Sequence, residues 1–369
     1  MIKINILSPG RFHVCDLARE LNRCGFDVKI YSFVPVSRTV KFGLPKRCCC
    51  SLFYWLLPFL FLERRLFAGT IWANLLRKRV QDFLTAILMR KCDVLITMSG
   101  GFFQSIKKAK SQGSIIVVER GSKHALEQNK ALENMMDINA KGCRILTERE
   151  MLSYELADYI SIPSEHVRRS FIDHHYPKDK LFLNPYGVDV SMFKPSRNAY
   201  KKYDLIMVGG WSLRKGCDLI IEAVRKMGCN LLHVGAIVDV AFPDEQSFTH
   251  VDSVDESLLP EYYHMAKVFV MPSREDGFGM VFTQALACNL PIIGSPDCGA
   301  PDLKKMVEYP ENITIISDYS VDALCMAIKE AMSNYEKLGS ISYAGNALEN
   351  LTWEAYGKRY SNFINSVIS

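Results

Sequence analysis

The segment that decides the fold is residues 271–295, which read MPSREDGFGMVFTQALACNLPIIGS. It opens on the end of one apolar run and closes on another, so we expect two buried strands with a helix between them. Glu275 and Asp276 follow the first strand, and Gly277 and Gly279 open the helix. A helix that begins at such a turn aims unpaired amides and the positive end of its dipole at whatever the loop holds. This geometry favours a bound anion.

Outward from this segment, short apolar runs alternate with amphipathic stretches, the pattern of parallel sheets covered by helices on both faces. The sequence therefore predicts an α/β chain of two Rossmann-like domains, residues 1–190 and 200–350, joined by a linker within 187–202 that contains Pro195 and mixed polar residues. An amphipathic helix is expected near the end, from residue 353. The predicted strands are 2–7, 27–33, 93–98, 114–118 and 159–163 in the first domain, and 204–209, 230–234, 267–271, 291–294 and 312–315 in the second.

The composition excludes several classes of protein. With 49% hydrophobic and 23% charged residues in 369, the chain is neither disordered nor collagen-like, and a net charge of +5 is too small to indicate a nucleic-acid partner. Residues 1–190 hold 29 basic and 18 acidic side chains, so the first domain carries the positive charge and favours an anionic surface or substrate. Among the twelve cysteines, Cys48, Cys49 and Cys50 are consecutive and lack the paired spacing of a zinc site, and we expect no signal peptide before the first strand. We expect a protein of the reducing cytoplasm.

Residues 51–62, SLFYWLLPFLFL, are nearly all apolar but too few to span a membrane as a helix. Two interpretations remain open. The segment lies in the headgroup region of an anionic membrane, or it is a buried helix of the first domain with a solvated basic rim. The flanking basic residues are Lys46, Arg47, Arg64, Arg65, Arg77, Lys78 and Arg79.

Two further loops follow predicted strands. Residues 8–13, SPGRFH, lack the three-glycine turn of a dinucleotide site, which disfavours a nicotinamide dehydrogenase, although Gly10 still lets backbone amides approach a phosphate or sugar. In residues 208–216, VGGWSLRKG, Arg214 and Lys215 precede the next helix. This loop and the 271–295 loop share one edge of the second sheet, where ligands of such sheets bind.

Taken together, Asp276, Gly277-Phe278-Gly279, Gln284 and the following Ala-Leu-Ala and Leu-Pro-Ile-Ile resemble the nucleotide-sugar site of retaining glycosyltransferases of family four. That family has the GT-B fold, in which two Rossmann-like domains face a central cleft and a C-terminal helix crosses back to the first domain. Residues 184–189, NPYGVD, are similar to its interdomain segment, and Trp353-Glu354 opens what resembles the crossing helix.

The resemblance implies that the second domain binds a nucleoside-diphosphate sugar and that cations stabilise the departing diphosphate. Two departures matter. Gln284 stands where the family has a second glutamate, and Gly210 stands where it has an arginine, so Arg214 would supply that charge. Which of Glu275 and Asp276 faces the sugar stays open. The expected donor-binding residues are Gly10, Gly209, Arg214, Lys215, Glu275, Asp276, Gly277, Phe278, Gly279, Met280 and Gln284. The expected catalytic residues are Arg214, Lys215, Asp276, Arg120 and His124.

Arg120 and His124 belong to a loop of the first domain, after the strand at 114–118, that resembles the family's loop toward the transferred sugar and the acceptor. Arg120 is suited to bidentate phosphate binding. His124 either bonds a sugar hydroxyl or is structural. Residues 99–101, SGG, shape the acceptor cleft or form a turn. Glu148, Glu150 and Glu155 are expected on a solvated helix face.

The resemblance implies a retaining transferase that moves a hexosyl group from a UDP- or GDP-sugar to an acceptor hydroxyl. The acceptor is expected to be a saccharide or lipid-linked saccharide of a surface polysaccharide, and the protein is expected to be cytoplasmic and peripheral on the inner face of the cell membrane. No Asp-x-Asp triplet occurs, so no metal or other cofactor is expected.

Two other functions share this fold. A nucleotide-sugar epimerase would act on the free donor, without an acceptor. A catalytically silent nucleotide-sugar-binding protein would keep the fold while it loses donor contacts, and the departures at Gln284 and Gly210 keep this alternative open.

Overall fold

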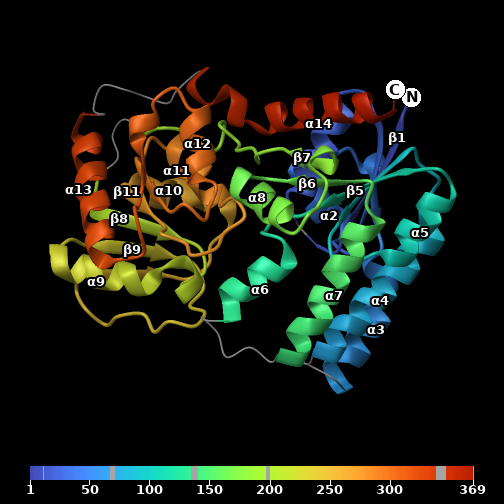
Figure 1. Cartoon of the computed structure of the whole chain (residues 1–369), viewed down its shortest axis with the longest axis horizontal. Coiled ribbons are helices and arrows are strands. Elements are labelled where there is room, and N and C mark those ends of the chain that lie inside the picture. The colour runs from blue at the N-terminus through green and yellow to red at the C-terminus, as the bar shows by residue number, and fades with distance from the viewer. Residues whose placement is uncertain (11, 67–70, 134–139, 197–199, 338–345, 369) are drawn as a thin grey trace.

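The computed structural model describes residues 1–10, 12–66, 71–133, 140–196, 200–337 and 346–368. Within these residues the first half of the chain forms a seven-stranded parallel sheet in the order β3-β2-β1-β4-β5-β6-β7. Its strands are β1 (Lys3–Ser8), β2 (Asp27–Ser32), β3 (Cys49–Ser51), β4 (Val94–Met98), β5 (Ile115–Glu119), β6 (Tyr159–Ile162) and β7 (Leu181–Leu183). Figure 1 shows this sheet on the right, apart from a second sheet on the left.

The second sheet is also parallel and, among the described residues, has six strands in the order β10-β9-β8-β11-β12-β13. They are β8 (Tyr203–Val208), β9 (Leu231–Val234), β10 (Phe248–Val251), β11 (Ala266–Val270), β12 (Ile292–Gly294) and β13 (Ile313–Ile315). Every predicted strand is present. The prediction missed β3, β7 and β10, which are edge strands of three or four residues and too short to give a periodic signal.

Helices cover both sheets, as the α/β prediction requires. In α1, Val14, Leu17, Ala18 and Leu21 are buried on the face that meets the sheet, and Gly25 follows the helix with a φ of +92°. The longer helices of the first half are α1 (Val14–Arg23), α3 (Phe53–Leu66), α4 (Ile71–Leu88), α5 (Phe103–Ser111), α6 (Ala125–Glu133), α7 (Ala140–Leu156) and α8 (Glu165–Asp173). Those that follow are α9 (Cys217–Met227), α10 (Leu259–His264), α11 (Met280–Ala287), α12 (Ala300–Met306), α13 (Val321–Lys337) and α14 (Trp353–Ile368).

Each sheet has one point where the strand order reverses. In the first sheet the chain runs outward from β1 to β2 and then restarts on the other side with β4, and in the second it runs from β8 to β9 and restarts with β11. Ligands of such sheets bind beyond the carboxyl ends of the strands at this switch point. The loops after β1, β4, β8 and β11 are therefore the first places to look for a site.

Helix α14 returns to the first domain and lies along its upper edge in Figure 1. It packs against α1 so closely that a Cβ on Gly357 would lie 2.2 Å from the Cβ of Glu20. Phe363 stacks on Phe182 of β7 with 4.1 Å between ring centroids, and the Arg359 Nε donates to Asn184 Oδ1 at 2.7 Å. The predicted crossing helix is confirmed.

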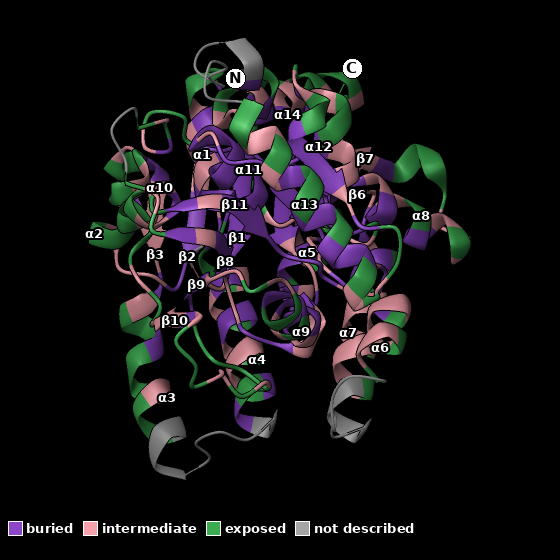
Figure 2. Ribbon diagram, turned by 90° about the vertical axis from the view of Figure 1, so that its left-hand side faces the viewer, coloured by how far each residue is buried: buried purple, intermediate pink, exposed green. Residues whose placement is uncertain are grey.

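Helices α3 and α4 extend from the body on the lower side of Figure 2, where α3 is mostly exposed. In the apolar segment 51–62, Leu52 and Leu56 are buried, whereas Tyr54 and Trp55 are 70% and 65% exposed. The segment is therefore not a buried core helix, because only one of its faces is packed. In the described part of the chain, no helix combines the length and apolarity needed to cross a bilayer. The side chains of Arg64 and Arg65 lie outside the described residues.

Candidate active site

The loop between β11 and α11 has the predicted geometry. Gly279 is the N-cap of α11 with a φ of +76°, a conformation that glycine adopts without strain. A Cβ on Gly277 would lie 1.6 Å from the carbonyl oxygen of Gly121 in the first domain, so only glycine permits this contact. The Gly277 carbonyl accepts a hydrogen bond of 2.5 Å from Ser164 Oγ, also from the first domain. The loop is therefore one of the places where the two domains touch.

Two cations meet two carboxylates beside this loop. Lys215 pairs with Asp276, and Arg214 Nη1 lies 3.1 Å from Glu275 Oε2. Burial raises the pKa of the Asp276 carboxyl, but the charge of Lys215 and its hydrogen bond, with the charge of Arg214, outweigh that effect and hold the pKa below its ordinary value. Glu275 is fully buried, and its Oε1 atom has no hydrogen-bond partner among the described residues. The residues from 208–216 and 271–295 thus form one charged cluster at the switch point of the second sheet.

Gln284 lies one turn into α11 and is 7% exposed. Its Oε1 accepts a hydrogen bond from the Tyr263 hydroxyl at 3.1 Å, and its Nε2 donates to Glu256 Oε1 at 3.0 Å. The amide thereby holds the exposed carboxylate of Glu256 in place. No pattern in the sequence pointed to Glu256, because it lies in the poorly patterned stretch before α10.

The remaining predicted donor residues occupy different environments. Phe278 is 1% exposed, and its ring packs edge-on against Tyr186, so the side chain belongs to the core. Met280 is 38% exposed at the start of α11. Gly209 has a φ of +131° at the end of β8. Gly10 lies in the first domain, in the loop after β1.

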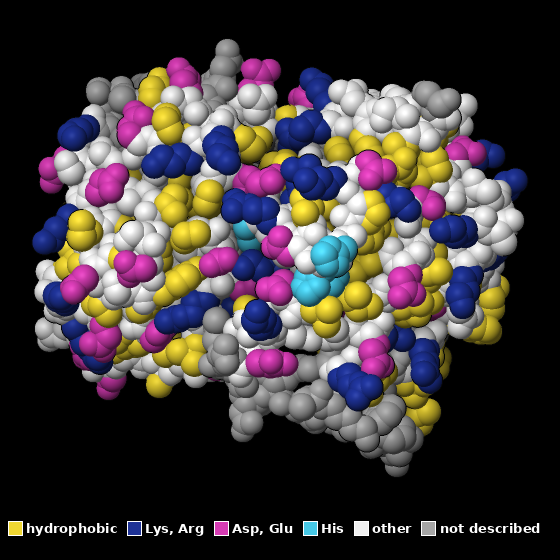
Figure 3. Space-filling view, viewed as in Figure 1, with side chains coloured by type: hydrophobic (Ala, Val, Ile, Leu, Met, Phe, Trp, Pro, Cys, Tyr) yellow, Lys and Arg dark blue, Asp and Glu magenta, His cyan; other side chains and the backbone are white. Residues whose placement is uncertain are grey.

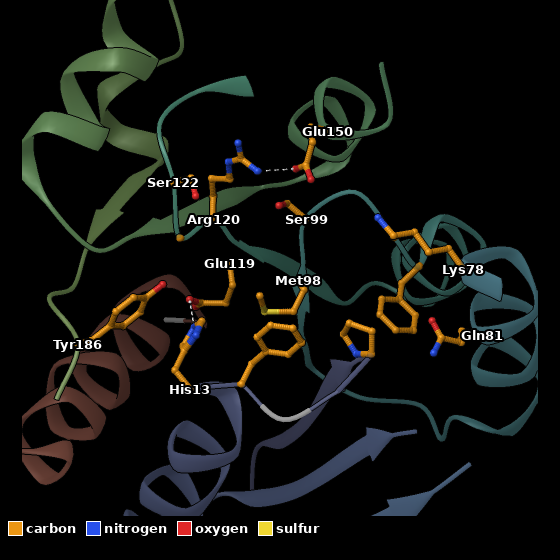
Figure 4. Close-up of a pocket in the computed structure, with 15 residues that line it drawn as sticks. His13, Lys78, Gln81, Met98, Ser99, Glu119, Arg120, Ser122, Glu150 and Tyr186 are labelled. Atoms are coloured by element: carbon orange, nitrogen blue, oxygen red, sulfur yellow. Dashed lines mark hydrogen bonds and ion pairs between the residues drawn. The ribbon is translucent and has the colours of Figure 1, made fainter. Parts of the chain in front are cut away.

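A cavity of about 420 Å³ opens at the carboxyl edge of the first sheet, at its switch point between β1 and β4 (Figure 4). Lys78 and Gln81 reach it from α4, and Glu119 and His13 form its floor at the ends of β5 and the β1 loop. We call this cavity the domain-one pocket. Its lining consists of Pro9, Phe12, His13, Lys78, Gln81, Met98, Ser99, Gly101, Phe102, Glu119, Arg120, Gly121, Ser122, Glu150 and Tyr186.

Arg120 lines this pocket, but its guanidinium is already engaged. Nη2 donates to the Lys123 carbonyl at 2.9 Å and to Gln128 Oε1 at 2.7 Å, and Nη1 lies 3.2 Å from a carboxylate oxygen of Glu150. The expectation that Glu150 is merely solvated was wrong, because its carboxylate lines the pocket and pairs with Arg120. Helix periodicity could not show this contact, since it depends on how α7 packs against β5.

His124 lies outside the lining of the pocket. It stacks on His174 with 4.2 Å between ring centroids and contacts the rings of Tyr154 and Phe171. Burial, and then the charges of His174 and Arg120, lower the pKa of His124 to about 4. The imidazole is therefore neutral at physiological pH and packs as one ring of an aromatic cluster.

Sequence reasoning missed most of the polar groups of the pocket: His13, Lys78, Gln81, Glu119 and Tyr186. One signal was available, because Glu119 is an acid at the carboxyl end of an apolar run. Lys78 looked like one of several basic residues flanking the 51–62 segment. Residues scattered over so much of the chain meet only in the folded sheet.

Charged side chains also gather along the boundary between the two domains, in the middle of Figure 3. Lys123 Nζ of the first domain lies 2.5 Å from Asp297 Oδ1 of the second. Among the residues that the structure describes, no group of three or more His, Cys, Asp or Glu side chains is arranged to hold a metal ion.

Comparisons with known proteins agree with this architecture. The profile of the family described as "Glycosyl transferases group 1" matches residues 191–347. Among solved structures, sucrose-phosphate synthase from Thermosynechococcus elongatus superposes with a TM-score of 0.65 at 16% identity, covering 100% of this chain and 99% of that one. Anabaena Alr3699/HepE in complex with UDP-glucose superposes with a TM-score of 0.67 at 14% identity, over 99% and 100%.

Two curated relatives are similar over part of their length. A GDP-mannose-dependent alpha-(1-6)-phosphatidylinositol monomannoside mannosyltransferase of Mycolicibacterium smegmatis is 26% identical over an alignment of 242 residues, and the match covers 56% of this chain and 62% of the relative. A probable sucrose-phosphate synthase of Thermosipho melanesiensis is 27% identical over an alignment of 249 residues, and the match covers 60% of this chain and 57% of the relative. The matched segment thus spans less than two thirds of either relative.

Two Rossmann-like domains that meet at a glycine loop, with a helix crossing back between them, define the GT-B fold. Residues 191–347 are similar to the glycosyl transferases group 1 family.

Proposed function

We propose that the protein transfers a hexosyl group from a nucleoside-diphosphate sugar, UDP- or GDP-linked, to an acceptor hydroxyl with retention at the anomeric carbon. The observation that carries this proposal is the placement of Arg214 and Lys215 beside the N-terminus of α11, at the switch point of the second sheet. A neighbouring structure of the same fold was solved with UDP-glucose. The profile match over the second domain supports the same donor class.

Each residue of the proposed nucleotide-sugar site then has a role. Lys215, Arg214 and the first amides of α11 bind the diphosphate and stabilise the charge that it gains as it leaves. Asp276 holds Lys215 in place until the diphosphate arrives. Glu275 Oε1, which lacks a hydrogen-bond partner in the described chain, accepts a hydrogen bond from a sugar hydroxyl. The leaving diphosphate takes the proton of the acceptor hydroxyl, as the resemblance to retaining transferases implies.

The domain-one pocket holds the acceptor, which we propose to be a saccharide linked to a lipid. Helix α4 connects the pocket to an apolar surface, because Lys78 and Gln81 line the pocket while Phe83 and Ile87 are 53% and 58% exposed elsewhere on the same helix. We call the exposed apolar side chains of α3 and α4 the apolar face. They are Tyr54, Trp55, Leu57, Phe61, Leu62, Leu76, Phe83, Ile87 and Leu88.

Nine of the 22 large apolar side chains that are exposed in the described chain lie on these two helices, a concentration that exceeds scattered surface exposure. Exposed aromatic side chains on helices that also carry Arg77 and Arg79 suit the headgroup region of an anionic membrane. We therefore propose that the protein acts at the inner face of the cell membrane, with the apolar face against the lipid. The mannosyltransferase relative, by its name, acts on a phosphatidylinositol mannoside.

The substitution Lys215→Ala tests the donor site. UDP- and GDP-sugars are first screened for protection of the wild type against thermal unfolding, because a bound ligand stabilises the folded state by mass action. With a protecting donor, we expect Lys215→Ala to lower turnover by about a hundredfold or more, the scale of losing one charge-stabilising group. The matched control is Lys226→Ala, since Lys226 is an exposed lysine paired with Asp322 on α13.

Equal turnover in the wild type and in Lys215→Ala would show that the diphosphate binds elsewhere. Protection by no nucleotide sugar would refute the donor class altogether. An isomerised nucleotide sugar, formed without any acceptor, would instead indicate an epimerase.

A further inference from the structure

Glu119 is a carboxylate that the fold has placed, almost without exposure, at the floor of the domain-one pocket. It is the last residue of β5 and is 1% exposed. Its Oε2 lies 3.0 Å from His13 Nε2, and its Oε1 accepts a hydrogen bond of 2.6 Å from the hydroxyl of Tyr360. The two partners come from opposite ends of the chain, the loop after β1 and helix α14. Figure 4 shows His13 and Glu119 directed toward one another.

A buried carboxylate destabilises the fold unless hydrogen bonds or a charge compensate for its lost hydration. Packing alone would be served by an apolar residue here, as it is by Val117 and Val118 on the same strand, which are fully buried. Tyr360 is itself fully buried, and its hydroxyl donates to Glu119. His13, Glu119 and Tyr360 therefore form a buried polar unit. Because burying it lowers the stability of the fold, the unit points to a role at the pocket.

The unit fixes the orientation of the His13 ring. The hydrogen bond to Glu119 sets Nε2 as the donor, and the ring packs on Tyr186 with 4.4 Å between centroids. In that tautomer Nδ1 carries a lone pair and accepts hydrogen bonds. In the described part of the chain, no group hydrogen-bonds Nδ1, and His13 lines the pocket. His13 is thus poised to accept a hydrogen bond from a ligand hydroxyl.

The rest of the lining suits a saccharide. Gln81, Ser99 and Ser122 supply amide and hydroxyl groups, while Phe12 and Tyr186 supply flat apolar surface. A few placed polar groups among apolar and aromatic side chains are typical of small-molecule sites. The pocket also adjoins the loop between β11 and α11, because Gly121 lines the pocket and would be the neighbour of a Cβ at Gly277.

We propose that His13 binds a hydroxyl of the acceptor saccharide through Nδ1, and that Glu119 and, through it, Tyr360 are positioning residues that hold His13 in the required tautomer. This inference rests on the proposed function, since it takes the pocket as the acceptor side of the transferase. It adds that the crossing helix α14 supports the acceptor site of the first domain. His13 is an acceptor-binding residue in this account and has no part in donor binding.

The variants are His13→Ala, Glu119→Gln and Tyr360→Phe. Glu119→Gln keeps the size of the side chain but replaces a carboxylate, which only accepts, by an amide that can also donate to Nε2, so the tautomer with Nδ1 as acceptor is no longer fixed. Tyr360→Phe removes one hydroxyl from a buried helix contact. The control is Tyr176→Phe, which removes a hydroxyl that bonds the Tyr154 carbonyl, away from the pocket lining.

The first measurement is saturation-transfer NMR with methyl α-D-glucopyranoside and methyl α-D-mannopyranoside as probes, which requires no donor and no turnover. We expect a signal from the wild type and from Tyr176→Phe, and its loss in His13→Ala and Glu119→Gln. No signal in the wild type, or an equal signal in His13→Ala, would overturn the inference. Because the probes bind without a nucleotide, this result is independent of whether the proposed donor is correct.

The second measurement separates acceptor from donor. We expect the acceptor KM to rise about tenfold in His13→Ala and Glu119→Gln and less in Tyr360→Phe, on the scale of one hydrogen bond, while acceptor-independent hydrolysis of the donor changes by less than about twofold. An equal fall in donor hydrolysis would place His13 at the donor sugar and contradict the proposal. A Tyr360→Phe variant with a lower unfolding midpoint but an unchanged acceptor KM would show that Tyr360 only packs.

Discussion

The two switch points of the molecule differ in how their residues are distributed along the chain. The site of the second domain is built from two short stretches, 208–216 and 271–284, each of which carries several of its groups in a row. The domain-one pocket draws on His13, Lys78, Glu119 and Tyr186, which are separated by tens of residues. A contiguous stretch can be read as a motif, whereas a dispersed set becomes visible only once the strand order is known.

The two regions also differ in what holds their charges. Around α11, cations and carboxylates pair with one another within the second domain, and a diphosphate can displace one partner of each pair. In the pocket, Glu119 is held by groups from both ends of the chain, and Arg120 is held by Glu150. The ion pairs around α11 suit a charged ligand that binds and is released. The contacts in the pocket suit a fixed surface that recognises a neutral hydroxylated ligand.

One added carbon atom is enough to break the contact between the loop before α11 and the domain-one pocket. Gly277→Ala places a Cβ 1.6 Å from the Gly121 carbonyl oxygen, so the donor loop and the pocket must move apart. We expect turnover to fall by about a hundredfold or more, because displacing reacting groups by about 1 Å costs that much. The control is Lys226→Ala, which changes an exposed side chain of the second domain outside both regions. Turnover that survives in Gly277→Ala at more than about a tenth of the wild-type value would show that this contact is dispensable.

A smaller effect is expected at the apolar face of α3 and α4. Trp55 and Phe61 are 65% and 71% exposed, so changing both to serine leaves packing intact. We expect this double variant to bind vesicles of phosphatidylglycerol and phosphatidylcholine about tenfold more weakly in a flotation assay, since the lost apolar contact is worth a few kcal/mol at most. Tyr200→Ser with Met326→Ser, at sites 83% and 72% exposed in the second domain, serves as the control. Equal flotation of the two double variants would argue against the apolar face as the membrane contact.

Most of the fold could be predicted because the strands of parallel sheets are buried on both faces and read as continuous apolar runs, such as Leu205 to Val208 in β8. Segment 51–62 could not be resolved in this way. Its packed face and its exposed face are both apolar, so Leu56 and Trp55 look alike in the sequence although one is buried and the other is 65% exposed. Hydrophobic periodicity is informative only where the exposed face is polar.

The candidate site, like the fold, could be predicted from the sequence only in part. The loop between β11 and α11 was predicted from its glycines and from the acids at the end of a strand, and Lys215 lies beside it. Glu256 and His13 could not be found, because their significance comes from a hydrogen bond to a residue far away in the chain. His124 shows the converse, since a histidine in a suggestive loop proves to be packed among aromatic rings.

A crystal structure of the protein with a UDP- or GDP-sugar tests the central claim most directly. The account predicts that the diphosphate lies against the first amides of α11, with Lys215 Nζ turned from Asp276 to a phosphate oxygen and Arg214 beside it. A nucleotide found in the domain-one pocket, or a Lys215–Asp276 pair left intact beside a bound nucleotide, would contradict it.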